Sequence, residues 1–442
     1  MKNQKPFNRG FVILGAILVQ LALGAIYAWS VYTKQLVEAG WSRAETQMVF
    51  SAGLAVFAIV MVMAGRMMPK VGPRKLAFSA GIVLGLGYIL AGLFGAENFL
   101  TTFLFVGVLG GAGIGLGYVV PIAVGMRWFP DKKGMITGLA VAGFGFGATL
   151  WMAVADQLGA LGGGKLLAGI GLSNTFIVYG IAYLVLVSVG SIWMVFPPEG
   201  WKPVGYRPPE ATKKNSAGTI NFTSSEMLKT PQFYLILVTF TFGAAAGLMS
   251  IGLMRLWPQE ALTKAGISPE AAGAAATMAM AVFFALFNGL GRILWGMISD
   301  KIGRKNSIII MMATQGLFVI LFQWMAGNEI TLYLFAILIG FNFGGNFALF
   351  PTITADTFGT KYVGQNYGWV FLAYAVGGIL GPVMGGRLGD LNNFPLAFTI
   401  CGILCFVAVL SIALVKPATK PLDTISPFSE PEKTGGVKTS VT

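Results

Sequence analysis

The 442-residue sequence contains no histidine, only two cysteines and only 17 acidic residues. Cys401 and Cys405 lie one helical turn apart in a single apolar segment, so we expect them to be packing residues and expect no metal site. The sequence shows no nucleophile–base pair, no general acid/base pair and no cofactor motif in a supporting context, so we expect neither an enzyme nor a bound cofactor. Charged residues make up 11% of the chain, against about 25% in soluble proteins, which excludes an ordinary soluble domain.

Apolar residues make up 55% of the chain and gather in runs long enough to cross a bilayer, for which about 20 residues are needed. Glycine occurs 61 times, and small residues let membrane helices approach closely. We therefore predict an all-α polytopic membrane protein. Its twelve expected transmembrane helices cover approximately residues 11–33, 47–68, 76–96, 100–126, 134–156, 173–196, 232–256, 271–298, 306–326, 331–355, 364–388 and 395–415.

The basic residues give a formal charge of +13, but they lie in short clusters between apolar segments. They form no single basic face, so we expect no nucleic-acid partner. Of the 30 lysines and arginines, 23 lie in loops or tails that would share one side with the N-terminus. The positive-inside rule then predicts that both termini are cytoplasmic, in the cell (inner or plasma) membrane. We expect the first apolar run to be retained as a span because it is long for a signal peptide and lacks a clear cleavage site.

An internal repeat divides the chain. Residues 65–75 follow the second span and residues 296–306 follow the eighth, at an offset of 231 residues. An offset of six spans gives two six-helix repeats of the same orientation, and such parallel repeats occur in transporters. The predicted domains are an N-terminal bundle (1–196), a cytoplasmic linker (197–231), a C-terminal bundle (232–415) and a cytoplasmic tail (416–442), the last expected to be disordered.

Arg292 lies inside the apolar stretch 279–298, which contains no acidic residue. A guanidinium stays charged, and placing it near the middle of a membrane helix costs about 2.5–3.5 kcal/mol on insertion scales. We expect a substrate anion to be its partner; the alternative is that the side chain extends toward the cytoplasm. Asn288 lies one turn earlier on the same face, where it would orient the arginine or the anion, or simply bond a neighbouring helix.

The residues 296–305, Gly-Met-Ile-Ser-Asp-Lys-Ile-Gly-Arg-Lys, resemble the loop signature of the major facilitator superfamily. The copy after the second span departs from that signature, because Pro69 replaces its acidic residue. Within the superfamily, residues 27–32, 127–134, 230–233, 287–292, 342–351 and 366–368 resemble the oxalate/formate antiporter family. This resemblance implies the superfamily fold and a carboxylate-binding role for Arg292. It also implies aromatic walls at Tyr27, Tyr118, Phe144, Phe343, Phe347 and Phe371.

Tyr374 departs from the exchanger that the chain resembles, which has a lysine at this place. With a neutral phenol here, a second carboxylate would lack a fixed cation, and two unit charges 4 Å apart interact by about 4 kcal/mol at an effective dielectric of 20. We therefore expect a monocarboxylate such as formate, lactate or pyruvate, with oxalate:formate exchange proper as an alternative.

The pair Asn288 and Arg292 also resembles the Asp-x-x-x-Arg pair of monocarboxylate transporters, but the amide cannot carry a proton. Since the spans hold almost no acidic residues, we expect substrate to neutralise Arg292, which favours antiport by alternating access. Proton-coupled symport is the alternative. The expected partners are a small carboxylate anion, with a proton in the symport case, and the lipid bilayer; a monomer is expected. A partner-coupled sensor stays open as well, and transport by liposomes containing only this chain distinguishes it.

Overall fold

The computed structural model of the chain describes residues 8–155, 166–198, 201–203, 205, 221–254, 256–391 and 393–418. In these ranges the chain is helical and contains no strand. Twelve helical stretches are long and apolar enough to cross a membrane, which confirms the predicted number of spans. They are Gly10–Trp29, Met48–Val71, Pro73–Phe94, Phe99–Trp128, Lys133–Ala155, Gly169–Ser191, Pro231–Leu253, Pro269–Ile302, Arg304–Met325, Glu329–Phe358, Val363–Gly389 and Phe394–Ala413.

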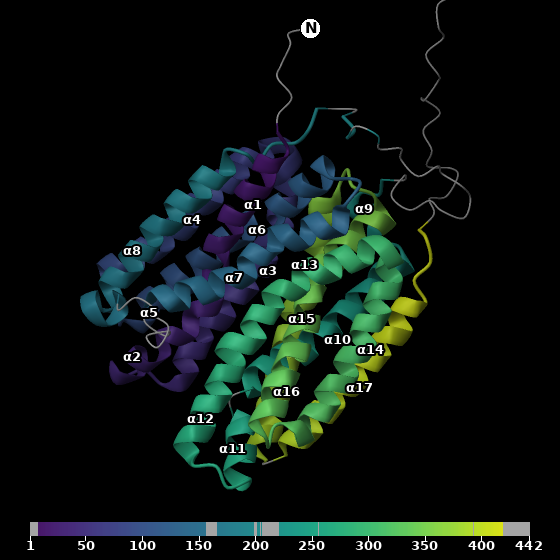
Figure 1. Cartoon of the computed structure of the whole chain (residues 1–442). Helices are drawn as coiled ribbons and strands as arrows, with labels where there is room; N and C mark the ends of the chain where they lie inside the picture. The colour runs from purple at the N-terminus through teal and green to yellow at the C-terminus, as the bar shows by residue number, and fades with distance from the viewer. Residues whose placement is uncertain are drawn as a thin grey trace, which may run out of the picture.

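The helices form two bundles, drawn purple to blue and teal to yellow in Figure 1. The first consists of α1 (Gly10–Leu23), η1 (Gly24–Val31), α2 (Thr33–Glu38), α3 (Arg43–Val71), α4 (Pro73–Phe94), α5 (Phe99–Thr102), η2 (Phe103–Gly110), α6 (Gly111–Trp128), α7 (Lys133–Ala155) and α8 (Leu166–Ser191). After the short α9 (Ser224–Met227), the second consists of α10 (Pro231–Leu253), α11 (Leu256–Lys264), α12 (Pro269–Met278), η4 (Ala279–Phe284), α13 (Ala285–Ile302), α14 (Arg304–Met325), α15 (Glu329–Phe358), α16 (Val363–Asp390) and α17 (Phe394–Ala413). We call the two bundles the N half and the C half.

The main contacts between the halves are those of α7 with α13 and of α3 with α16; α7 also contacts α15, and α6 contacts α16. Glycines make these approaches possible. A Cβ on Gly138 would lie 2.0 Å from the carbonyl oxygen of Arg292, and one on Gly65 would lie 2.3 Å from the carbonyl oxygen of Gly364. No side chain larger than hydrogen fits at such distances, so the backbones of the two halves meet directly. The arginine is therefore held at a close contact between the halves.

Several spans depart from regular α-helix in a way that hydrophobic periodicity does not reveal; the sixth, for example, is interrupted at Gly171. The first ends in a 3₁₀-helix, η1, which carries Tyr27. The fourth and eighth contain π-helical turns, η2 and η4, and η4 ends directly before α13. A π-helical turn changes the phase of all residues that follow it, and such turns are frequent at functional sites. In the eighth span this change of phase comes just before Asn288 and Arg292.

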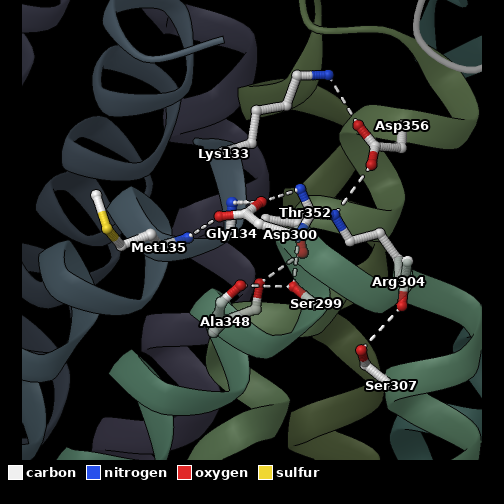
Figure 2. A network of polar contacts seen from close by, with 12 residues as sticks. Lys133, Gly134, Met135, Ser299, Asp300, Arg304, Ser307, Ala348, Thr352 and Asp356 are labelled. Atoms are coloured by element: carbon white, nitrogen blue, oxygen red, sulfur yellow. Dashed lines mark hydrogen bonds and ion pairs between the residues drawn. The ribbon is translucent and has the colours of Figure 1, made fainter. Parts of the chain in front are cut away.

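One end of the molecule is closed by a polar network that involves both halves, shown in Figure 2. The carboxylate of Asp300 accepts hydrogen bonds from the backbone N–H groups of Gly134 and Met135, at 2.9 and 2.8 Å. Asp356 accepts from Lys133 at 2.8 Å and from Arg304 at 3.1 Å. We call this the termini end, because α17 finishes here: Lys305 donates to the carbonyl oxygens of Ala413 and Val415. At the opposite end α2 and α5 lie apart from α11 and α12 (Figure 1).

The linker is described only in part, and it contacts the termini end. Trp201 packs edge-on against Trp128 of the N half, with ring centroids 4.7 Å apart. On the C half, the N–H of Phe222 donates to the carbonyl oxygen of Phe358, and Asn366 donates to the carbonyl oxygen of Phe222. Linker residues 199–200, 204 and 206–220 and the tail beyond residue 418 lie outside the described residues, so the predicted disorder of the tail stays a prediction.

Candidate functional site

Arg292 of α13 is fully buried, with an exposed fraction of 0%. Its Nε donates to Asn288 Oδ1 at 3.0 Å, and its Nη1 donates across the interface between the halves to the carbonyl oxygen of Val141 at 2.9 Å. Its Nη2 is buried and makes no hydrogen bond. The arginine thus does not extend toward the surface, and Asn288 holds it as the spacing of one helical turn allows.

The positive charge of Arg292 has neutral neighbours. Its two hydrogen-bond acceptors are an amide and a backbone carbonyl, and its guanidinium carbon lies 4.1 Å from the centre of the Phe347 ring and 5.7 Å from that of Phe144. Cation–π contacts of this kind contribute up to about 2 kcal/mol when desolvated. They stabilise the charge without neutralising it. The site can therefore take an anion at the free Nη2 and gain a full charge pair.

The N half supplies an aromatic wall in which Phe144 of α7 is central. Its ring meets Tyr27 edge-on at 5.3 Å and Tyr118 edge-on at 5.2 Å between centroids. The ring of Phe57, on α3, packs against Tyr118 at 5.1 Å and against Phe144 at 6.2 Å. The Tyr118 hydroxyl is buried and has no hydrogen-bond partner, which costs about 1–3 kcal/mol if nothing satisfies it. A carboxylate oxygen is an acceptor that would satisfy it.

The C half supplies the other wall. Phe347 of α15 and Phe371 of α16 pack on Tyr374 at 5.4 and 5.1 Å. Phe343 packs edge-on against Phe347 at 5.4 Å and supports the ring that lies over Arg292. The Tyr374 hydroxyl shares a short hydrogen bond with the hydroxyl of Tyr27 in the N half. The structure thus brings together all nine residues predicted from the sequence, with Phe343 behind Phe347.

Three participants were missed from the sequence. The carbonyl of Val141 gives no sequence signal, because every residue carries a backbone carbonyl. Phe57 was one phenylalanine among 34 and had no distinguishing neighbour. Tyr367 is fully buried and packs on Phe371 at 5.7 Å. It could have been found, since residues 367, 371 and 374 are spaced four and three apart and share one face of a helix.

Within the part of the chain that the structure describes, no acidic side chain hydrogen-bonds to Arg292 or forms an ion pair with it. Asp300 and Asp356 belong to the polar network at the termini end. Within the described part of the chain, no group of three or more His, Cys, Asp or Glu residues is placed to hold a metal ion. Both cysteines are free and buried. The chemistry available around Arg292 is thus that of one cation, one amide, phenol hydroxyls and aromatic rings.

The chain is similar to known proteins in both sequence and fold. The family model described as the Major Facilitator Superfamily matches residues 10–262 and 244–438. The oxalate:formate antiporter of Oxalobacter formigenes is 28% identical to this chain, with 96% of each chain covered. Monocarboxylate transporter 14 of Mus musculus is 23% identical over 91% of this chain and 88% of its own length. The structure of the proton:xylose symporter XylE is similar with a TM-score of 0.63, at 14% identity over 91% of this chain and 94% of that one.

Proposed function

Because this chain belongs to the Major Facilitator Superfamily, we propose that it is a secondary transporter of small monocarboxylates that binds the substrate carboxylate at Arg292. The twelve spans make the chain a multi-pass membrane protein, and its relatives in both sequence and fold are transporters rather than enzymes. The observation that carries the proposal is the fully buried guanidinium with an unpartnered Nη2 at the contact between the two halves.

A monocarboxylate fits the charge of the site better than a dicarboxylate does. Among the described residues, the groups in contact with the Arg292 guanidinium are neutral. They are Asn288, the Val141 carbonyl and the rings of Phe144 and Phe347. Tyr374 stands where the exchanger that the chain resembles has a lysine, and its hydroxyl bonds another phenol. One substrate charge is therefore neutralised, and a second would be left desolvated at a cost of several kcal/mol.

The same charge balance favours exchange. Without an anion, alternating access would carry an unneutralised guanidinium through the closed, low-dielectric state; with one carboxylate bound, the pair is neutral. Reorientation is then fast only with substrate bound, which is the behaviour of an antiporter. Proton-coupled symport is the competing mechanism, and the phenol pair Tyr27 and Tyr374 is the group through which a proton would have to pass.

For the arrangement in the cell we propose a monomer in the inner or plasma membrane, with the termini end in the cytoplasm. The support is the distribution of charge: 23 of the 30 basic residues lie in loops and tails on that side. Ion pairs such as Lys133 with Asp356 and Arg304 with Asp300 also lie at this end. Labelling of single cysteines placed at either end of the molecule tests the orientation.

Binding of a panel of carboxylates to the purified protein tests the substrate class. A ligand that binds only the folded state raises the stability by RT ln(1 + [L]/Kd), about 2.7 kcal/mol at a hundredfold excess over Kd. Formate, lactate, pyruvate and glycolate are expected to raise the melting temperature of the wild type, whereas oxalate does so less. Arg292→Gln is the matched control, expected to melt independently of every anion. Stabilisation of this variant to the same extent as the wild type contradicts the proposed role of Arg292.

A further inference from the structure

The hydroxyl of Tyr367 is a buried polar group that the site described above does not use. The residue is 0% exposed, and its hydroxyl makes no hydrogen bond. Its ring packs on Phe371, a residue of the site described above. Tyr118 is buried in the same way: it is 1% exposed, and its hydroxyl makes no hydrogen bond.

These two tyrosines come from opposite halves. Tyr118 belongs to α6 of the N half and Tyr367 to α16 of the C half. The ring of Phe371 lies against both of them, with centroids 5.3 Å from Tyr118 and 5.7 Å from Tyr367. Two buried hydroxyls, one from each half, thus flank the ring of Phe371. One carboxylate has two oxygens with about four lone-pair positions, enough to accept from both hydroxyls.

The position of Tyr367 along α16 gives the pair a direction. Tyr367 lies seven residues before Tyr374, about 10 Å along the helix axis at 1.5 Å per residue. Val363, where α16 begins, belongs to the termini end, because the adjacent Lys361 carbonyl accepts from Arg127 there. Tyr27 and Tyr374 are thus a phenol pair on the far side, already bonded to each other. Tyr367 is four residues from the start of α16 and lies nearer the termini end, whereas Tyr118, ten residues before the end of α6, lies at about the depth of Tyr374.

We propose that Tyr367, together with Tyr118, forms an inner anion-binding station that holds the substrate carboxylate by hydroxyls of both halves as it passes between Arg292 and the termini end. This inference rests on the proposed function. Hydrogen bonds from neutral hydroxyls to a carboxylate are short and strong. Donors from the two halves on one anion also join the halves, so that substrate on the termini-end side promotes closure there. Tyr367 accordingly binds the substrate that enters or leaves on the termini-end side, and its loss should lower the substrate affinity on that side.

The test measures substrate affinity separately on each side. Purified protein is reconstituted in one known orientation, and exchange of labelled formate, lactate, pyruvate and glycolate is measured while the concentration is varied either inside or outside. Tyr367→Phe keeps the ring and its packing on Phe371 and removes only the hydroxyl. It is expected to raise the half-saturating concentration about tenfold on the termini-end side, and less than about threefold on the other, as loss of one hydrogen bond to an anion predicts.

Two further variants make the result specific. Tyr118→Phe is expected to raise the half-saturating concentration on both sides, because Tyr118 also lines the site around Arg292. Tyr32→Phe is the matched control: Tyr32 is 1% exposed and packs on Phe176 at 5.0 Å, in the N half away from Arg292. It should change neither side.

If Tyr367→Phe raises the half-saturating concentration equally on both sides, or changes it on neither side, the inner station is overturned. The proposed function stands in that case if the wild type exchanges a carboxylate and Arg292→Lys does not. A wild type that exchanges none of the four anions instead contradicts the proposed function itself.

Discussion

Asn288 and Arg292 illustrate what can be predicted about single residues. Their hydrogen bond follows from a spacing of four on one helix, and the burial of the arginine follows from the apolar stretch around it. The acceptor of Nη1 does not follow, because the carbonyl of Val141 comes from another helix of the other half. Tyr374 was identified by its departure from a related exchanger, but its bond to Tyr27 depends on how the two halves meet. Local chemistry was thus predictable, and contacts between halves were not.

The amide of Asn288 predicts the effect of one charge-changing substitution. In Asn288→Asp, an ionised carboxylate would stand at the place of the amide oxygen, 3.0 Å from Nε, where it would neutralise Arg292 and compete with the substrate. The adjacent guanidinium favours the ionised form of this carboxyl, so the carboxylate keeps its charge at pH 5.5 as at pH 7.5. We expect exchange by this variant to be at least about tenfold slower than exchange by the wild type at both pH values, because the substrate must displace an internal ion pair. Exchange by the variant at the wild-type rate argues against the pairing.

Tyr374→Lys should change which anion is preferred. A lysine here places a second cation near the substrate, so a dicarboxylate no longer leaves one charge unpaired. We expect the ratio of oxalate to formate affinity to rise by about 10- to 100-fold, measured by competition against labelled substrate. Tyr374→Phe removes the hydroxyl without adding charge and is the control, for which this ratio should stay near that of the wild type. An unchanged ratio in Tyr374→Lys removes the residue from the site.

At the termini end, polar contacts between helix ends of the two halves close the molecule. In the loop signature after the eighth span, Asp300 pairs with Arg304 at 2.5 Å. The sequence did not predict that Asp300 also accepts from the first N–H groups of α7, in the other half. In the N half Pro69 stands at the corresponding place, and α16 begins without a side-chain cap. The two contacts that close this end are therefore unequal: a carboxylate of the C half binds the start of α7, and, among the described residues, no corresponding carboxylate of the N half binds the start of α16.

Asp300→Asn should weaken this closure. The amide can accept one of the two N–H bonds but loses the charge that favours a helix N-terminus, an effect of about 0.3–1 kcal/mol, and it loses the ion pair with Arg304. We expect faster labelling of a cysteine placed at Thr137, a buried residue of α7 two positions beyond Met135 whose hydroxyl makes no hydrogen bond, and a lower exchange rate. Glu260→Gln breaks a comparable pair, Glu260 with Lys264 on α11, outside the network. If both substitutions have the same effect on labelling, the closing role of Asp300 is wrong.

For the whole molecule, the twelve spans and the fold were accessible because apolar length and a repeated loop motif are properties of sequence alone. The 3₁₀ and π turns in the first, fourth and eighth spans were not, since they depend on packing between helices. These turns adjust which residues face the contact between halves, where Arg292 lies. The two halves thus meet at one guanidinium, and the proposed exchange mechanism requires that a bound anion neutralise its charge before the halves reorient.

Counterflow in liposomes containing only this chain is the measurement that tests this central claim most directly. Wild-type liposomes preloaded with unlabelled monocarboxylate should take up labelled substrate at least about tenfold faster than empty ones, without an imposed proton gradient. Arg292→Lys keeps the charge but loses the planar donor geometry, so it should lose most of this acceleration, and Arg292→Ala should lose all of it. Equal uptake with and without internal substrate contradicts the exchange mechanism, and full counterflow by Arg292→Ala contradicts the role of Arg292 in binding.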